Sequence, residues 1–147
     1  MIEIKIITPS ETNPIRQAIL RKGKPIETCS FEGDELPTTT HYGIFNKNKL
    51  IGVVSSFQNN NNLFENKNQI QLRGMAVLEK EQKKGMGNLL LEYVEKDIRT
   101  QNKSLIWFNA REKAILFYEK MEYNILGLPF EIPEIGTHYL MYKKLSV

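Results

Sequence analysis

The stretch RGMAVLEKEQKKGMGNLLLEYVEKDI, residues 73–98, constrains the fold and the function of this chain more than any other. It begins with the apolar residues of a strand and ends with the apolar spacing of an amphipathic helix. Between the two stand Lys83, Lys84, Gly85 and Gly87. An ordinary strand-to-helix turn needs one glycine at most and gains nothing from lysines. The additional glycine and the two lysines therefore predict that this loop binds a ligand.

The chemistry of this loop favours a phosphate group. A helix N-terminus exposes backbone N–H groups without internal partners and carries a partial positive charge. Glycines let the backbone approach the phosphate oxygens and adopt positive φ. The spacing is that of neither a nucleotide P-loop nor GxGxxG. It is Gln82-x-x-Gly85-x-Gly87, and a simple solvated turn is the alternative interpretation.

Length and composition predict one domain over residues 1–147, and they exclude several classes of protein. A net charge of +3 from twenty Lys and Arg against seventeen Asp and Glu leaves nucleic-acid binding a weak alternative. Cys29 is the only cysteine, which excludes an internal disulfide and favours an inert, small apolar side chain over a nucleophile. No apolar run is long enough for a signal peptide or a membrane span. We therefore expect a cytoplasmic protein that binds neither membranes nor metal.

The hydrophobic pattern predicts an α/β (α+β) domain in which helices cover a mixed sheet. A first helix is expected with Asn13 as its cap and Ile15, Ala18 and Ile19 on its inner face. A later helix, from about residue 88, is expected to bury Leu91, Val94 and Ile98. The expected strands are 2–8, 41–45, 50–57, 69–77, 104–110, 123–130 and 137–145, and the expected helices are 13–20, 88–99 and 112–121.

Two motifs together resemble the GNAT superfamily of N-acetyltransferases. The loop at Gln82, Gly85 and Gly87 is similar to that family's pyrophosphate loop for acetyl-CoA. The segment NAREKAILFYEKMEY is similar to its fifth strand and fourth helix, with the pattern Ala114, Phe117, Tyr118, Glu122 and Tyr123. Glu122 stands where the family has glycine. The resemblance implies a mostly antiparallel central sheet of about seven strands flanked by helices.

The resemblance also implies a cofactor site for acetyl-CoA. The pantetheine arm would pair with the backbone of a strand that splays from its neighbour, and Tyr118 would donate a proton to the departing thiolate. A core aromatic is the alternative reading of Tyr118. The residues implied in cofactor binding are Met75, Ala76, Val77, Gln82, Lys83, Lys84, Gly85, Met86, Gly87, Asn88, Asn109, Ala114, Phe117 and Tyr118.

The general base is harder to assign. Many family members carry a glutamate on the fourth strand, where this chain shows Gln71 and Arg73, and neither can accept a proton near neutral pH. The remaining candidates are His41 and His138, the latter supported by Glu131 or Glu134. A structural histidine is an equally good reading of each.

This chain also resembles a narrower group of uncharacterised bacterial GNAT proteins, at residues near both ends of the sequence. This second resemblance suggests a shared acceptor pocket. Arg21, Arg73 and Arg111 are candidates to hold a substrate carboxylate or phosphate, although exposed arginines usually contact only solvent. The residues that carry this resemblance are Arg16, Leu20, Arg21, Asp34, His41, Gly43, Gly136, His138 and Met141.

The leading hypothesis is an acetyl-CoA-dependent N-acetyltransferase acting on an amine of a small molecule or protein, as a monomer or homodimer. A catalytically degenerate module that binds CoA as a sensor is the second, motivated by the missing strand carboxylate. A mildly basic nucleic-acid binder on the same fold is the third, and a steep salt dependence of its affinity would identify it.

Overall fold

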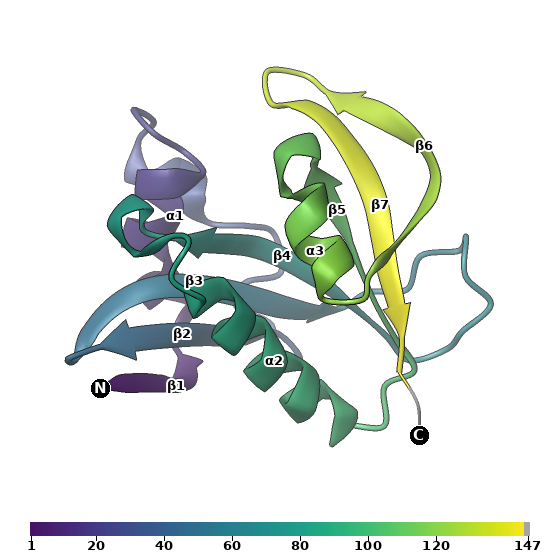
Figure 1. Ribbon diagram of the computed structural model, residues 1–147, viewed down its shortest axis with the longest axis horizontal. Coiled ribbons are helices and arrows are strands. Elements are labelled where there is room, and N and C mark those ends of the chain that lie inside the picture. The colour runs from purple at the N-terminus through teal and green to yellow at the C-terminus, as the bar shows by residue number, and fades with distance from the viewer. Residues whose placement is uncertain (146–147) are drawn as a thin grey trace.

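The computed structural model describes residues 1–145 and consists of one seven-stranded sheet with helices on both faces (Figure 1). The strand order is β1-β2-β3-β4-β5-β7-β6. All neighbours are antiparallel except β4 and β5. The strands are β1 (Ile2–Ile7), β2 (Thr40–Asn46), β3 (Lys49–Gln58), β4 (Gln69–Val77), β5 (Leu105–Arg111), β6 (Asn124–Ile132) and β7 (Gly136–Lys144). The predicted fold class is confirmed.

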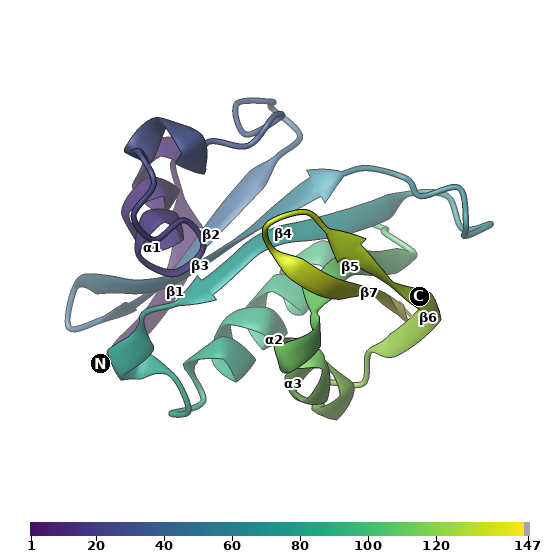
Figure 2. The same cartoon turned by 90° about the horizontal axis from the view of Figure 1, so that it is seen from above.

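The three α-helices divide between the faces of the sheet. Helix α1 (Asn13–Ile19) lies on one face, and α2 (Met86–Arg99) and α3 (Ile115–Lys120) lie on the other (Figure 2). We call these the α1 face and the α2 face. Short 3-10 turns lead into or connect the longer elements, at Pro9–Thr12, Ile26–Cys29, Glu79–Glu81 and Glu112–Ala114.

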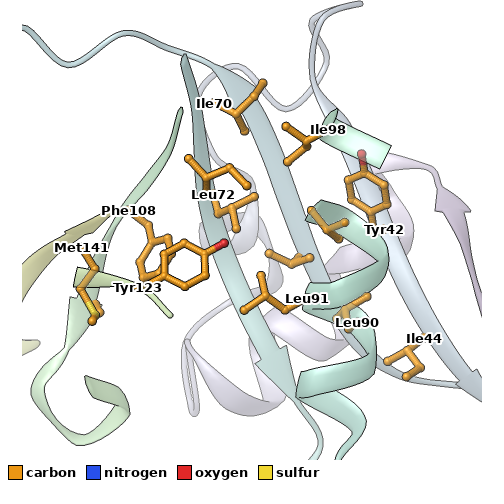
Figure 3. Close-up of a cluster of buried hydrophobic side chains, with 14 of the residues drawn as sticks. Tyr42, Ile44, Ile70, Leu72, Leu90, Leu91, Ile98, Phe108, Tyr123 and Met141 are labelled. Carbon is orange, nitrogen blue, oxygen red and sulfur yellow. The ribbon is translucent and has the colours of Figure 1, made fainter. Parts of the chain in front are cut away.

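The larger of two apolar core clusters lies between α2 and the sheet, and the smaller one lies under α1. The predicted inner residues Leu91, Val94 and Ile98 of α2 are fully buried. They pack with Ile70 and Leu72 of β4 and with apolar residues from β2, β5 and β7 (Figure 3). The 3.6-residue apolar period of α2 therefore identified its buried face. This packing fixes the N-terminus of α2 beside the end of β4.

The β2–β3 hairpin also follows from its sequence. Asn46 pairs with Lys49, so Lys47 and Asn48 form a two-residue turn, with φ of 51° and 67°. Two successive positive φ angles are the mark of a type I′ turn, whose twist matches that of the flanking strands. The predicted hairpin at NKNK is confirmed.

Strands β4 and β5 separate soon after they begin. Their parallel pairing covers only Gln69–Gln71 against Leu105–Trp107, and Figure 1 shows the two strands diverging beyond it. A bulge at Gly74, with φ of 68°, shifts the β3–β4 register at the same level. A Cβ on Gly74 would also lie 2.8 Å from the ring of Phe31. Glycine is therefore required at this position by both conformation and packing.

The first helix differs from its prediction. Ala18, expected inside, is exposed, and Arg16, not expected inside, is completely buried. The N-cap is Thr12 rather than Asn13, and the helix ends at Ile19. Arg16 lies on the buried side because acceptors from distant segments surround its guanidinium, as described below. Helix α2 begins at Met86, two residues before the predicted start.

Candidate active site

The loop before α2 presents backbone donors at an open surface. Lys83 and Gly85 adopt left-handed φ angles of 63° and 82°, and a Cβ on Gly85 would meet nothing within 4 Å. The first helical bond runs from the Leu89 N–H to the Gly85 carbonyl oxygen, at 3.1 Å. The N–H groups of residues 86–88 have no acceptor within residues 1–145. Such donors at a helix N-terminus can bind an anion.

Two side chains of the predicted loop site fix the loop itself. The Gln82 side-chain amide donates to the Val77 carbonyl oxygen at 2.8 Å, and the Asn88 amide lies 3.2 Å from Sδ of Met121. Lys83 is exposed, and Nζ of Lys84 lies 3.9 Å from a Glu81 carboxylate oxygen. The structure therefore gives Gln82 and Asn88 supporting contacts, while the backbone presents the open donors.

Residues from three predicted cofactor segments meet at Gly87. A Cβ on this glycine would lie 3.3 Å from Cζ of Phe117 and 3.5 Å from Cε of Met75. Gly87 belongs to α2, Phe117 to α3 and Met75 to β4. A larger side chain at position 87 would push these elements apart. The two glycines of the motif thus act differently, Gly85 through its conformation and Gly87 through close packing.

Tyr118 lies half-buried on the α2 face among aromatic rings. Its ring centroid lies 4.4 Å from that of Phe108 and 5.1 Å from that of Phe117. Burial raises the pKa of Tyr118 to about 12. Its hydroxyl forms no hydrogen bond to any other residue that the structure describes. The phenol is therefore protonated at neutral pH and has a free donor.

The predicted cofactor residues Ala114 and Asn109 lie near α3 but differ in orientation. Ala114 is the N-cap of α3, beside the helix that carries Phe117 and Tyr118. Asn109 follows Phe108 on β5, so its exposed side chain projects from the α1 face, away from Tyr118. The structure does not bring the Asn109 side chain to the other predicted cofactor residues.

Glu122 preserves the turn after α3 without a glycine. Its φ is 72°. The Glu122 N–H donates to the Glu119 carbonyl oxygen and the Tyr123 N–H to the Tyr118 carbonyl oxygen, both at 3.0 Å. These two bonds define a Schellman motif, in which the left-handed residue is usually glycine. The departure from the family pattern therefore leaves the local geometry intact.

The α1 face holds a buried ionic cluster around Arg16, which we call the Arg16 cluster. Nη1 of Arg16 donates to Asp34 at 2.6 Å and to the Cys29 carbonyl oxygen at 2.9 Å. Nη2 donates to Asp34 and to Oγ of Ser55, each at 3.1 Å. Burial alone would raise the pKa of the Asp34 carboxyl, but hydrogen bonds from Arg16 and the Phe31 N–H lower it overall.

His41 belongs to the Arg16 cluster and has both ring nitrogens occupied. Nε2 lies 2.9 Å from the Asp34 carbonyl oxygen and Nδ1 lies 2.6 Å from Oγ of Ser55. A carbonyl oxygen only accepts, so Nε2 carries a proton. Oγ of Ser55 accepts from Arg16 and can donate to Nδ1, so both ring nitrogens are engaged. This geometry argues against the predicted role of His41 as a base.

His138 has a free ring nitrogen. Nδ1 donates to the Gly136 carbonyl oxygen at 2.9 Å, and Nε2 has no hydrogen-bond partner in the described part of the chain. His138 pairs with Arg111 across β5–β7, which places it on the α1 face. Glu131 or Glu134 was expected to support it, but the Glu131 carboxylate instead accepts from Oγ1 of Thr137, and neither glutamate is bonded to His138 in the described part of the chain. The expected carboxylate partner is therefore replaced by a backbone carbonyl.

Sequence reasoning missed Phe31 and Ser55 on the α1 face. Phe31 lies against the Arg16 guanidinium, whose Cζ is 3.8 Å from the ring centroid. Phe31 and Ser55 carry no periodic or motif signal in the sequence. Arg16, Asp34 and His41 did have a signal, in the pattern shared with the narrower bacterial group, but it did not show that the three are bonded together.

No helix within residues 1–145 has both the length and the apolar character needed to cross a membrane.

Comparison with known proteins identifies the family of this chain. The family model described as the acetyltransferase (GNAT) family matches residues 9–123. An uncharacterised N-acetyltransferase, YitI, from Bacillus subtilis is 34% identical over 145 residues, covering 99% of this chain and 97% of that protein. The similarity therefore extends over nearly the whole length of both proteins.

Solved structures share the fold at low sequence identity. The ribosomal-protein-S18-alanine N-acetyltransferase from Escherichia coli has a TM-score of 0.80 at 16% identity, covering 100% of this chain and 96% of that one. A putative N-acetyltransferase from Lactobacillus plantarum has a TM-score of 0.81 at 14% identity, covering 99% of both. An aminoglycoside 6'-N-acetyltransferase complexed with coenzyme A scores 0.72 at 16% identity, covering 97% of this chain and 96% of that one. The chain belongs to the acetyltransferase (GNAT) family and is an acyltransferase of that type.

Proposed function

We propose that this protein is an acetyl-CoA-dependent N-acetyltransferase that transfers the acetyl group directly to a primary amine of a small molecule or peptide. The observation that carries the proposal is the N-terminus of α2, whose unpaired N–H groups lie beside strand β4, which pairs with β3 along its length but has no β5 partner beyond Gln71. Coenzyme A offers a pyrophosphate for the first feature and an amide-containing arm for the second.

The proposed cofactor-binding residues lie on β4 and in the loop before α2. The backbone of Met75, Ala76 and Val77 would pair with the pantetheine arm, and the N–H groups around Gly85 and Gly87 would hold the pyrophosphate. When bound, acetyl-CoA supplies an acetyl group activated as a thioester. A backbone N–H of β4 would stabilise the negative charge that develops on the carbonyl oxygen during transfer.

Tyr118 is the proton donor in this proposal. Its free hydroxyl and its raised pKa keep it a donor throughout the neutral range. A tyrosine buried only for packing would be expected to bond its hydroxyl to a neighbour, as Tyr123 does to Glu95 at 2.8 Å. The contrast between these two tyrosines of the same aromatic cluster supports a functional role for Tyr118.

His138 is the group that accepts the amine proton or anchors the amine. The bond from Nδ1 to the Gly136 carbonyl oxygen leaves the lone pair on Nε2 in the neutral ring. We leave His41 out of this role because its two nitrogens are occupied. Arg73, rather than a carboxylate, occupies β4 on the same face, so His138 is the residue that fits the base best.

The proposal is tested by titrating acetyl-CoA into Gly85→Val and into Gly127→Val. Both glycines have nearly the same φ, 82° and 80°, and open surroundings, so the two variants suffer similar backbone strain. Gly127 lies on β6, away from the loop. Calorimetry should show weaker acetyl-CoA binding for Gly85→Val alone, by about 10-fold or more, the loss of roughly one charge-assisted hydrogen bond.

Equal binding by both variants and the parent protein would contradict the loop assignment. A panel of amines, amino acids, aminosugars, polyamines and peptides, assayed by thiol release, tests the transfer itself. Tight acetyl-CoA binding without transfer to any amine would favour a CoA-binding regulatory module, for which the missing β4 carboxylate is the structural argument.

A further inference from the structure

Arg73 occupies the position on β4 where that strand separates from β5. The last β4–β5 pair is Gln71 with Trp107. Arg73 is two residues further along β4, so its side chain projects from the same face as Gln71. It pairs with Ser55 of β3, which places it beside the Arg16 cluster. Its guanidinium therefore lies on the α1 face, next to the opening between the strands.

Two aromatic rings hold the Arg73 guanidinium. Its Cζ lies 4.7 Å from the ring centroid of Phe31 and 5.3 Å from that of Phe57. Cation–π contacts of this kind orient a guanidinium without using its N–H groups. Within residues 1–145, Arg73 has no hydrogen-bond acceptor and no carboxylate oxygen within 4.0 Å. Its planar set of donors is therefore oriented but unused.

The neighbouring acid, Asp34, is bonded to other donors and not to Arg73. Both carboxylate oxygens of Asp34 accept from Arg16, and one of them also accepts from the Phe31 N–H. Nε of Arg16 is itself a buried donor without an acceptor. The cluster thus retains an unpaired buried donor, and its carboxylate, Asp34, is already bonded to Arg16.

The charges around Arg73 point in the same direction. Burial lowers the pKa of Arg73; the charges of Asp34 and Glu32 oppose that shift, whereas the charges of Arg16 and Arg21 add to it. A half-buried cation without a bonded anion is unfavourable, and a ligand anion at this position would remove the imbalance.

We propose that the acceptor is a small amine that also carries a carboxylate or phosphate group, and that Arg73 binds this acid group on the α1 face. The guanidinium would donate two parallel hydrogen bonds to the anion. His138 lies on the same face, across the opening on the β5–β7 side, where the amine would react. This inference rests on the proposed function and specifies its acceptor.

Matched acceptor pairs test the inference on the parent protein without any mutation. Each pair differs only in the acid group: amino acids against their amides, and phosphoethanolamine against ethanolamine. Thiol release should give a KM lower by about 10- to 100-fold for the acidic member of at least one pair, as expected for a charge-assisted bidentate contact. The carboxylate and phosphate pairs then show which anion is preferred.

The variant Arg73→Met should raise the KM for the acidic acceptor by about the same factor, with kcat little changed, because the lost contact is made equally in the ground and transition states. Arg73→Lys should recover part of the affinity. Arg99→Met, which removes an arginine at the end of α2, is the control and should leave KM unchanged. Acetyl-CoA affinity, measured by calorimetry, should be the same in all of these proteins.

Acetylation of acidic and neutral partners with equal KM would overturn the inference and leave the proposed function standing. So would an Arg73→Met protein that binds acetyl-CoA and retains the parent's KM for the acidic acceptor. Failure of the parent protein to bind acetyl-CoA would overturn the proposed function and this inference together. If Arg73→Met does not fold, the matched pairs on the parent protein decide the question.

Discussion

The two faces of the sheet present site residues of different kinds. On the α2 face, the loop at Gly85 offers backbone N–H groups at an open surface. On the α1 face, charged side chains such as Arg16 and Asp34 are buried and bonded to one another. The first arrangement depends on local chain conformation. The second depends on residues that are brought together from distant parts of the sequence, so the two faces should respond to mutation in different ways.

The largest expected effect is on turnover, from Tyr118→Phe on the α2 face. The substitution keeps the ring and removes the hydroxyl, so kcat should fall by about 10²- to 10⁴-fold, the range typical of a general acid. Acetyl-CoA affinity and the melting temperature should hardly change. Because the pKa of Tyr118 is about 12, its ionisation should cause no loss of turnover below about pH 11. Steady-state kinetics over pH check both points.

His138→Ala is the counterpart of Tyr118→Phe on the α1 face. It should lower turnover by about 10²-fold and leave acetyl-CoA affinity unchanged, because the loop at Gly85 is untouched. Near-parental turnover of Tyr118→Phe would remove Tyr118 from the mechanism, whatever His138→Ala does. Together the two variants show whether both faces contribute to proton transfer.

The next largest effect is on stability, from Asp34→Ala in the Arg16 cluster. This substitution leaves the buried Arg16 guanidinium without its acid and should reduce the free energy of unfolding by about 3–5 kcal/mol. Glu35→Ala, at the exposed neighbouring position, is the control and should change it by less than about 0.5 kcal/mol. Urea denaturation measures both. A loss of less than about 1 kcal/mol for Asp34→Ala would show that the pair contributes little.

The same carboxylate predicts a pH dependence of stability. The folded-state pKa of Asp34 is lowered, so its contribution is present above the unfolded pKa near about 4 and is lost as pH falls through the folded pKa. The parent protein should therefore lose stability below about pH 4. Asp34→Ala should show a shallower loss there, and an equally steep loss would contradict the assignment.

The smallest effect is expected at the turn after α3, where Glu122→Gly should stabilise the fold. A left-handed conformation costs a non-glycine residue roughly 1 kcal/mol, so glycine should raise the free energy of unfolding by about 0.5–1 kcal/mol. Thermal and urea denaturation can resolve this difference. Turnover should stay at the parental value, because the Schellman bonds already hold Tyr118 in place; destabilisation would show that φ at Glu122 is not strained.

The same contrast between the two faces explains which parts of the fold and of the candidate site could be predicted from the sequence. Strand β4, the loop and α2 follow one another within 31 residues, from 69 to 99, so local signals sufficed: an apolar strand, two glycines and a helical period. The structure confirmed Leu91, Val94 and Ile98 as the inner face of α2. The N–H groups at the helix start were implied by the helix itself.

The Arg16 cluster could not be predicted in the same way. The apolar period of a helix assigns charged residues to its outer face. It therefore predicted Ala18 on the inner face and did not predict Arg16 there. Burial of Arg16 depends on Asp34 and the Cys29 carbonyl oxygen from a long loop and on Ser55 from β3. Only the folded chain brings these acceptors together. For the same reason His41 looked like a free base, although Ser55 and the Asp34 carbonyl oxygen occupy its ring.

The short pairing between β4 and β5 has a consequence for local opening of the sheet. The three pairs at Gln69–Gln71 are the junction between two antiparallel half-sheets, β1–β4 and β5–β7–β6. Helix α2 packs on both halves through the central core. We expect amide hydrogens beside the junction to exchange with solvent sooner than those inside either half, through local openings that leave each half intact. The surface on which a substrate would bind thus lies beside the part of the sheet that we expect to open most readily.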